Sequence, residues 1–215
     1  PSRGLGDVYK RQGIYRQVTL THTPKLYIVP DGIFVYTKRI TFDADQNPTE
    51  AFLCGEVTVG NDTGSDRLVN VTVTLSGAVS RSAKILVKAG RQATARIPLT
   101  VLQPRLWDAE NPNLYQVTAQ LEELGTFGTH LCPVSENAMR DADTTSFGIR
   151  TVTADAIHGL RVNGKTVKIR GGCIHHDNGL LGAVSLYDSE YRKLKILKDG
   201  GFNCVRLAHN PPSRC

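Results

Sequence analysis

The sequence feature that most constrains the fold is a strict alternation of apolar and polar residues. Between Val69 and Leu75 every second residue is apolar, and Asn70, Thr72 and Thr74 occupy the positions between them. Because successive side chains of a β-strand point to opposite faces, this period of two predicts a strand with one buried and one solvated face. Such strands are typical of antiparallel sheets, so we predict a mainly β domain.

Similar apolar-rich runs recur along the chain. They are the segments EVTVG, AKILVKAG, ATARIPLTV and LYQVTAQLEE, and the clusters GNDTGSD and KAGRQ separate them as predicted turns. In the last run the apolar members are Leu114, Val117, Ala119 and Leu121. Short strands at this spacing predict a β-sandwich over residues 30–150.

The start of the chain has a different character. Residues 1–12, PSRGLGDVYKRQ, lack the apolar run of a signal peptide, and we expect a non-native or disordered leader there. The segment GIYRQVTLTH then predicts a strand that includes Val18 and Leu20. Pro24 and Pro30 follow and mark the predicted crossing into the sandwich.

After Arg150 the sequence predicts a hairpin. Asn163-Gly164 lies between two apolar-rich arms, and this dipeptide favours a type I′ turn because both central residues of that turn need a positive φ. The second arm runs into Gly171-Gly172, where the missing side chains allow a backbone or a ligand to approach closely.

A helix is predicted next, over the segment YDSEYRKLKILKDGG. Asp188 or Ser189 is the predicted N-cap, and Gly200-Gly201 is the predicted left-handed exit. The apolar segment FNCVRLAH follows as a strand, so the order is strand, helix, strand, as in a parallel sheet or barrel. One face of the helix carries three apolar residues, Tyr191, Leu194 and Leu197.

Charge and cysteine content exclude several classes of protein. The net charge is +6, but Lys and Arg are scattered among Asp and Glu, so we expect no nucleic-acid partner. No apolar run approaches the ~20 residues of a membrane span, so we expect no membrane partner. The five cysteines form no CxxC pair, which predicts reduced, mostly buried thiols and favours a cytoplasmic protein; a periplasmic or secreted protein is the alternative. They are Cys54, Cys132, Cys173, Cys204 and Cys215.

Five segments follow one another in an order that is itself informative. They are GIYRQVTL, LWDAENPNLYQV, DTTSFGIR, LRVNGKTVKIRGGCIHHD and GFNCVRLAHNPPS, and they cover the chain from Gly13 to its end. Each is weak alone, but together they resemble glycoside hydrolase family 2, the β-galactosidase and β-glucuronidase group.

The resemblance implies three domains, of which this chain holds parts. Residues 13–29 would be the last strand and linker of a truncated N-terminal jelly-roll domain that binds sugar. Residues 30–150 would be a complete immunoglobulin-like β-sandwich. Residues 151–215 would be the first βαβ part of an incomplete TIM (β/α)₈ barrel, which cannot close on so few strands.

The resemblance also implies a sugar pocket. Barrel enzymes place their active site at the C-terminal ends of the strands, and CIHHD and VRLAHN would be the ends of the first two. The IHHD segment departs from the RHE and KHED forms of well-known members, which leaves the role of its second histidine open. Fixed donors and acceptors at such ends distinguish sugar hydroxyls. The candidate substrate-binding residues are His175, His176, Asp177, Arg206, His209 and Asn210.

Other interpretations of these residues stay open. His175, His176 and Asp177 could hold a metal, although adjacent strand residues point to opposite faces and no third ligand stands at helical spacing. Arg206 could pair with a structural carboxylate, and His209 could be a turn residue with its own partner. We expect no bound metal and no cofactor.

Trp107, the only tryptophan, has two interpretations as well. It could be a platform on which a sugar stacks, or an anchor in the core of the sandwich. We favour the core anchor because large aromatic side chains dominate protein cores.

The resemblance implies that the parent is a retaining exo-β-glycosidase of carbohydrate metabolism, most similar to β-galactosidases. Such enzymes need two carboxyl groups about 5 to 5.5 Å apart, and in this family both are glutamates on later barrel strands. We therefore expect this chain to be inactive by itself. Oligomers are common in the family, so the resemblance allows a homo-oligomeric parent. The alternative is a non-catalytic β-sandwich module that binds carbohydrate or another partner.

Overall fold

The computed structural model describes residues 18–126, 139–175 and 178–207. The chain divides into two compact units, one comprising His22–Thr166 and the other Pro1–Thr21 together with Val167–Cys215. The leader predicted at residues 1–12 lies outside the described residues. The predicted domain boundaries at residues 29 and 150 stay predictions.

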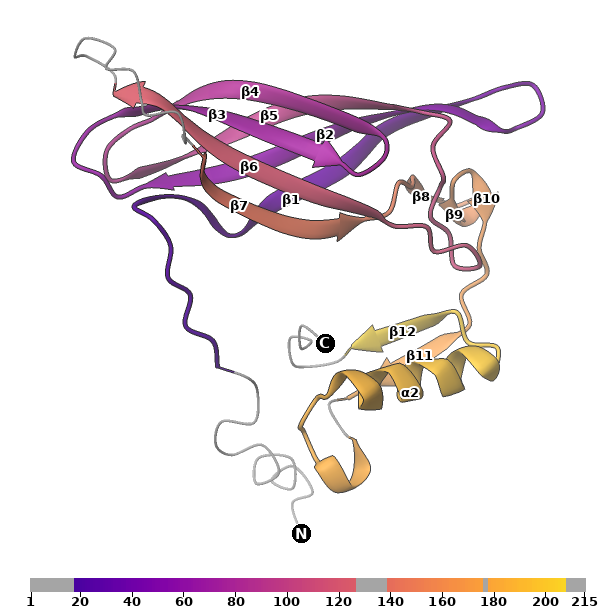
Figure 1. The fold of residues 1–215 in the computed structure, drawn as a ribbon. Coiled ribbons are helices and arrows are strands. Elements are labelled where there is room, and N and C mark those ends of the chain that lie inside the picture. The colour runs from indigo at the N-terminus through magenta and orange to yellow at the C-terminus, as the bar shows by residue number, and fades with distance from the viewer. Residues whose placement is uncertain (1–17, 127–138, 176–177, 208–215) are drawn as a thin grey trace. The chain divides into compact units, whose positions relative to one another are not determined.

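Two antiparallel sheets make up most of the unit His22–Thr166 (Figure 1). One sheet has the strand order β1-β2-β5 and the other the order β4-β3-β6-β7. The prediction of a mainly β chain is thus confirmed. The strands are β1 (Leu26–Phe42), β2 (Pro48–Asn61), β3 (Arg67–Leu75), β4 (Val79–Val87), β5 (Arg91–Leu102), β6 (Tyr115–Thr126) and β7 (Met139–Phe147).

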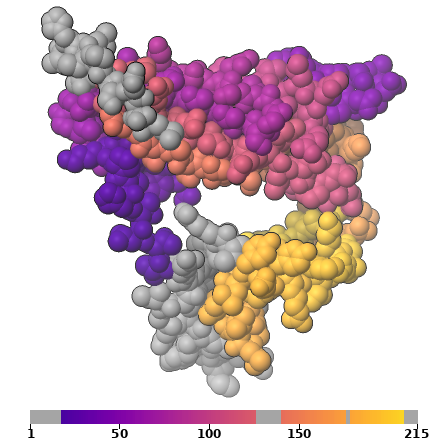
Figure 2. Space-filling view, in the orientation of Figure 1, coloured from indigo at the N-terminus to yellow at the C-terminus, as the bar shows by residue number. Residues whose placement is uncertain are grey.

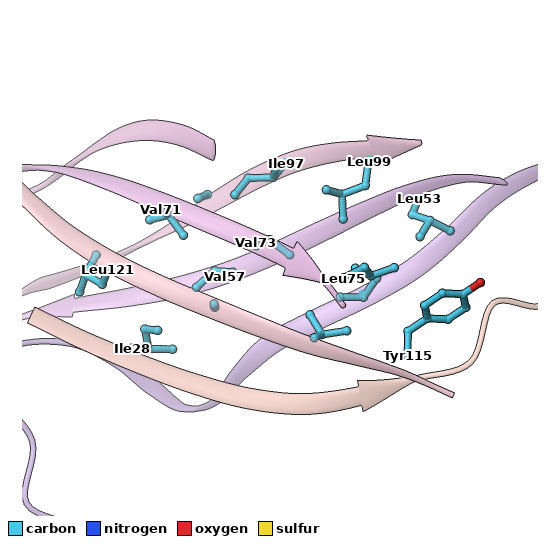
Figure 3. Close-up of a cluster of buried hydrophobic side chains, with 14 of the residues drawn as sticks. Ile28, Leu53, Val57, Val71, Val73, Leu75, Ile97, Leu99, Tyr115 and Leu121 are labelled. Atoms are coloured by element: carbon cyan, nitrogen blue, oxygen red, sulfur yellow. The ribbon is translucent and has the colours of Figure 1, made fainter. Parts of the chain in front are cut away.

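The inward faces of both sheets form one hydrophobic core (Figure 3). Val71 and Val73 from β3 and Leu121 from β6 are fully buried, as the alternation predicts. Leu53 from β2 and Leu99 from β5 meet them from the other sheet. The space-filling view shows the described atoms of this unit as one continuous body (Figure 2). Each such side chain contributes roughly 1.5–3 kcal/mol by leaving water, so this core holds the sandwich together.

Strand β6 begins one residue after Leu114, the first apolar member of its predicted run. Leu114 is 55% exposed, whereas Tyr115 is buried and continues the inward series of Val117, Ala119 and Leu121. The Tyr115 hydroxyl accepts a hydrogen bond from the backbone N–H of Arg105 at 2.9 Å. A tyrosine ring can be buried here because its polar tip finds this partner.

The predicted strand near the start of the chain is also wrong in its described part. Residues 18–24 form no strand, and Val18 and Leu20 are largely exposed. A strand needs a paired neighbour, and none of the described residues pairs with this stretch.

The first sandwich strand begins within the predicted crossing, between Pro24 and Pro30. β1 starts at Leu26 and continues through Pro30, with a register shift between Ile28 and Ile33 and a positive φ of 58° at Asp31. Proline fits there because β1 is an edge strand and the irregularity removes the need for a ladder hydrogen bond.

A small sheet of order β10-β9-β8 ends this unit. Asn163 and Gly164 form the predicted two-residue turn, with positive φ values of 51° and 77°. Asn163 also accepts the N–H of Thr151 at 3.0 Å and donates to the Trp107 carbonyl at 3.0 Å. The side chain of this turn residue therefore ties the hairpin to a sandwich loop. The strands are β8 (Val152–Asp155), β9 (Gly159–Val162) and β10 (Lys165–Thr166).

Trp107 is half-buried and lies outside the buried core cluster, so the prediction of a core anchor is wrong. The guanidinium carbon of Arg150 lies 4.8 Å from the centroid of its ring. The backbone of Gly148 runs so close that an added Cβ would be 2.7 Å from the Trp107 Cβ. Because backbone and guanidinium take up space around the ring, the indole serves here as a packing and cation–π partner.

The second unit contains a strand, a 3₁₀ turn, a helix and a second strand (Figure 1). The two strands pair in parallel, which confirms the predicted strand–helix–strand order. No helix in the described ranges is long and apolar enough to cross a membrane. The elements are β11 (Gly171–Ile174), η2 (Gly179–Leu181), α2 (Tyr187–Asp199) and β12 (Cys204–Leu207).

The ends of α2 differ in part from the prediction. Leu186 is the N-cap, and Ser189 in the first turn accepts its backbone N–H at 3.3 Å, so neither Asp188 nor Ser189 is the cap itself. Ser189 acts as the third residue of a capping box does, by reaching back to the cap. At the other end Gly201 has the predicted left-handed φ of 83°, whereas Gly200 does not.

We expect Gly148→Ala to disturb the Trp107 contact. The new methyl group would overlap the indole, so we predict a loss of about 1–3 kcal/mol in the free energy of unfolding. Because Trp107 is the only tryptophan, its fluorescence reports the site directly during urea unfolding. The matched control is Gly64→Ala, where an added Cβ meets nothing within 4 Å. Equal stability and emission in the two variants would contradict the packing described.

Candidate functional site

The candidate site lies at the C-terminal ends of β11 and β12. In this parallel pair Cys173 lies opposite Arg206 and Ile174 opposite Leu207. His175 directly follows the last residue of β11. Parallel strands end at the same edge of a sheet, so the structure brings His175 and Arg206 to one end of the strand pair. Four predicted residues lie outside the described residues: His176, Asp177, His209 and Asn210.

Arg206 is exposed and donates a hydrogen bond to the Cys173 Sγ at 3.5 Å. It forms no ion pair with any carboxylate among the described residues, so the interpretation as a partner of a structural carboxylate gains no support. His175 is exposed as well. A guanidinium and an imidazole at one strand end supply hydrogen-bond donors and acceptors suited to hydroxyl groups.

The cysteines of this unit correct one prediction. Cys54 in the sandwich is buried, but Cys173 and Cys204 are exposed free thiols, so the expectation of mostly buried thiols is wrong for them. Both lie on short strands whose described surroundings bury little surface. Cys132 and Cys215 lie outside the described residues.

Asn203 fixes the start of the strand pair. Its Oδ1 accepts the N–H of Arg170 at 2.8 Å, and its Nδ2 donates to the Lys168 carbonyl at 3.1 Å. Its backbone N–H donates to the Arg170 carbonyl at 3.0 Å. These three bonds join the residues before β12 to the residues before β11 and thereby set the parallel register.

Gly171 allows the two strands to approach. It pairs with Cys204, and a Cβ built on Gly171 would overlap the carbonyl group of Cys204. The sequence predicts close approach of a backbone or a ligand at Gly171-Gly172, and at Gly171 the approaching group is the backbone of β12. An added Cβ on Gly172 would meet no atom within 4 Å.

The connection between β11 and α2 is held by one carboxylate. Glu190 accepts hydrogen bonds from Asn178 at 2.9 Å, from Ser185 at 2.8 Å and from Lys193 at 3.0 Å. Burial by itself would raise the pKa of Glu190, but the bonds from Asn178, Lys193 and Ser185 outweigh it and lower the pKa to about 2. Glu190 is therefore ionised at neutral pH.

The described strand ends carry no carboxylate. The acidic residues in the described part of this unit are Asp188, Glu190 and Asp199, and all three belong to α2. The described ranges also contain no group of three His, Cys, Asp or Glu residues that could hold a metal ion. The described strand ends present the imidazole of His175 and the guanidinium of Arg206.

Comparison with known proteins identifies the family. The model of the glycosyl hydrolases family 2 matches residues 33–150, which is more than half of the chain. The chain belongs to this family. The match confirms the resemblance that the five sequence segments carry.

Relatives in glycoside hydrolase family 2 extend over nearly the whole chain. The β-galactosidase BoGH2A of Bacteroides ovatus is 33% identical over 95% of this chain, and a β-glucuronidase of Bacteroides fragilis is 27% identical over 96%. A crystal structure of a family 2 member from Bacteroides cellulosilyticus covers 89% of this chain with a TM-score of 0.73 and 31% identity. The chain spans only 23%, 28% and 23% of these three proteins, respectively.

Sequence reasoning missed the residues that hold the strand ends in place. Asn203 sits between a helix exit and a strand, where asparagine is a common turn residue. Glu190 has the sequence signature of an ordinary acidic residue near a helix N-terminus. Their partners, Lys168 and Asn178, are 35 and 12 residues away in the chain, so no local pattern reveals these contacts.

We expect Asn203→Ala to loosen the β11–β12 pair. The variant loses two side-chain hydrogen bonds, worth about 1–2 kcal/mol together, so amides of residues 170–174 should exchange with deuterium roughly 5- to 30-fold faster. Hydrogen-exchange mass spectrometry measures this effect. The control is Arg192→Ala, which replaces an exposed residue of α2. Equal exchange in both variants would refute a role of Asn203 in the register.

Proposed function

We propose that this chain is part of a longer retaining exo-β-glycosidase that hydrolyses terminal β-linked sugars. The observation that carries the proposal is the parallel pairing of β11 with β12, which places His175 and Arg206 at one strand end. Polar side chains at the C-terminal ends of parallel strands are the usual construction of an active site in a barrel enzyme. Membership of glycoside hydrolase family 2 supports the same chemistry.

In this proposal most of the chain belongs to two domains. Residues 30–150 form an immunoglobulin-like sandwich, which the strand orders β1-β2-β5 and β4-β3-β6-β7 support. Residues 151–215 begin a TIM barrel, and the β11-α2-β12 unit supplies its first parallel strand pair. A helix between two parallel strands is the repeating unit of such a barrel, which supports this assignment.

The six strand-end residues would bind the sugar and leave bond cleavage to other groups. Arg206 would donate to hydroxyl or ring-substituent oxygens, and the histidines and Asn210 would donate or accept according to their orientation. In this proposal the acid and the nucleophile are two glutamates on later barrel strands, outside this chain. This chain alone is then inactive.

We propose a β-galactoside as the substrate, because the more similar of the two relatives compared is named a β-galactosidase. The relative with 33% identity is named a β-galactosidase, and the relative with 27% identity a β-glucuronidase. Arg206 fits either substrate, because a guanidinium donates to neutral hydroxyls and pairs with the carboxylate of a glucuronide.

Hydrolysis assays with aryl β-galactoside and aryl β-glucuronide test this function. The complete protein should release the aryl alcohol, and the 215-residue chain should not exceed a buffer blank. In the complete protein Arg206→Ala should lower kcat/KM about 10- to 100-fold, the scale of one lost hydrogen bond from a charged group. Arg192→Ala, on the exposed surface of α2, should change it less than about 2-fold.

Three results would contradict the proposal. They are turnover by the 215-residue chain, equal activity of the two arginine variants, and a complete protein that binds carbohydrate without cleaving it. The last result would favour the non-catalytic binding module instead.

A further inference from the structure

Glu190 has an unusually complete set of partners for a residue on an exposed helix. Its Oε1 accepts hydrogen bonds from both Asn178 and Ser185, and its Oε2 accepts one from Lys193. The Glu190 side chain is 18% exposed and that of Lys193 22% exposed. Both carboxylate oxygens are thus engaged by the protein itself.

Asn178 is engaged just as fully. Its Nδ2 donates to Glu190 and to the Val184 carbonyl at 2.8 Å. Its backbone N–H donates to the Gly182 carbonyl at 2.8 Å, and its carbonyl accepts the N–H of Leu181 at 3.2 Å. Residues 178–185 therefore form a closed turn, and Glu190 joins both ends of that turn to the first part of α2.

The turn 178–185 lies close in sequence to the strand end that carries His175. Asn178 follows His175 after only two intervening residues. β12 fixes β11 as far as Ile174, and the bonds of Asn178 fix the chain again at the next described residue after His175. Described contacts therefore hold the chain at Ile174 and at Asn178, on either side of His175 in the sequence.

Glu190 is poorly suited to proton transfer in spite of its perturbed pKa. A general acid or base works best with a pKa near the operating pH, and the pKa of Glu190 is about 2. Its oxygens already accept three hydrogen bonds within the protein. A carboxylate in this state holds other groups in place.

We propose that Glu190 is a positioning residue, whose carboxylate ties the turn 178–185 to α2 and thereby fixes the strand end that carries His175. This inference rests on the proposed function, because the strand end matters only if it binds the substrate. A displacement of about 1 Å in a binding group can lower an enzymatic rate by up to about 100-fold, so a residue away from the substrate can control activity.

Glu190→Gln in the complete protein tests this role, with Asp188→Asn as the matched control. Both variants remove one negative charge from the first two turns of α2, but of the two described residues Glu190 is the one that accepts hydrogen bonds from the turn. Glutamine presents an N–H₂ group where one carboxylate oxygen accepts a hydrogen bond, so one donor faces another donor. We expect kcat/KM on the aryl glycoside to fall about 10- to 100-fold in Glu190→Gln and less than about 2-fold in Asp188→Asn.

Two further measurements separate positioning from other roles. The pH profile of kcat/KM should keep its two limbs in Glu190→Gln, because Glu190 transfers no proton. Hydrogen exchange should speed up at the bonded amides of the turn, Asn178, Leu181, Gly182 and Val184, in Glu190→Gln but not in Asp188→Asn. Asn178→Ala should reproduce these effects, and the double variant should be no worse than the more affected single variant.

The outcomes distinguish this inference from the proposed function. If the wild-type protein cleaves neither glycoside, the proposed function fails, and hydrogen exchange still tests the tie between the turn and α2. If the wild-type protein is active and Glu190→Gln behaves like Asp188→Asn, the positioning role is refuted. A shifted limb in the pH profile would also refute it, since that result marks Glu190 as an acid or base. Asn178→Ala serves the same comparison if Glu190→Gln does not fold.

Discussion

The parallel register between β11 and β12 is the constraint on which the candidate site depends. Only four residue pairs define it, from Gly171–Cys204 to Ile174–Leu207. A slip of one residue would turn Arg206 to the opposite face of the strand pair. Two features oppose such a slip: Gly171 leaves room for the β12 backbone, and Asn203 bonds to residues before β11. The register of the strand pair thus determines where the candidate side chains His175 and Arg206 lie.

The two units keep their shape by different means. The sandwich unit has a core of fully buried valines and leucines. Within its sheets, β2 pairs with β5 and β3 with β6 along nearly their whole lengths. In the described part of the second unit Ala183 is the only buried hydrophobic residue, while Ile169 and Ile196 are more than half exposed. Because so few apolar side chains are buried in this described part, hydrophobic burial contributes little to its stability. The polar contacts of Asn203 and Glu190 therefore carry more weight here than they would in a well-packed core.

Local rules predicted much of this fold, and the errors share one cause. The alternation in β3, the Asn163-Gly164 turn and the strand–helix–strand order each depend on residues that are close in sequence, and all three are confirmed. The predicted burial of Trp107, Cys173 and Cys204 failed because burial depends on distant parts of the chain. For the candidate site, the sequence identified His175 and Arg206 but missed Asn203 and Glu190, whose partners come from other segments.

A crystal structure of the complete protein with a bound, uncleaved β-galactoside would show whether the ends of β11 and β12 bind the sugar. We predict sugar oxygens within hydrogen-bond distance, about 2.7–3.2 Å, of the Arg206 guanidinium. A sugar bound elsewhere, with Arg206 and His175 out of reach of it, would show that these strand ends do not form the binding site.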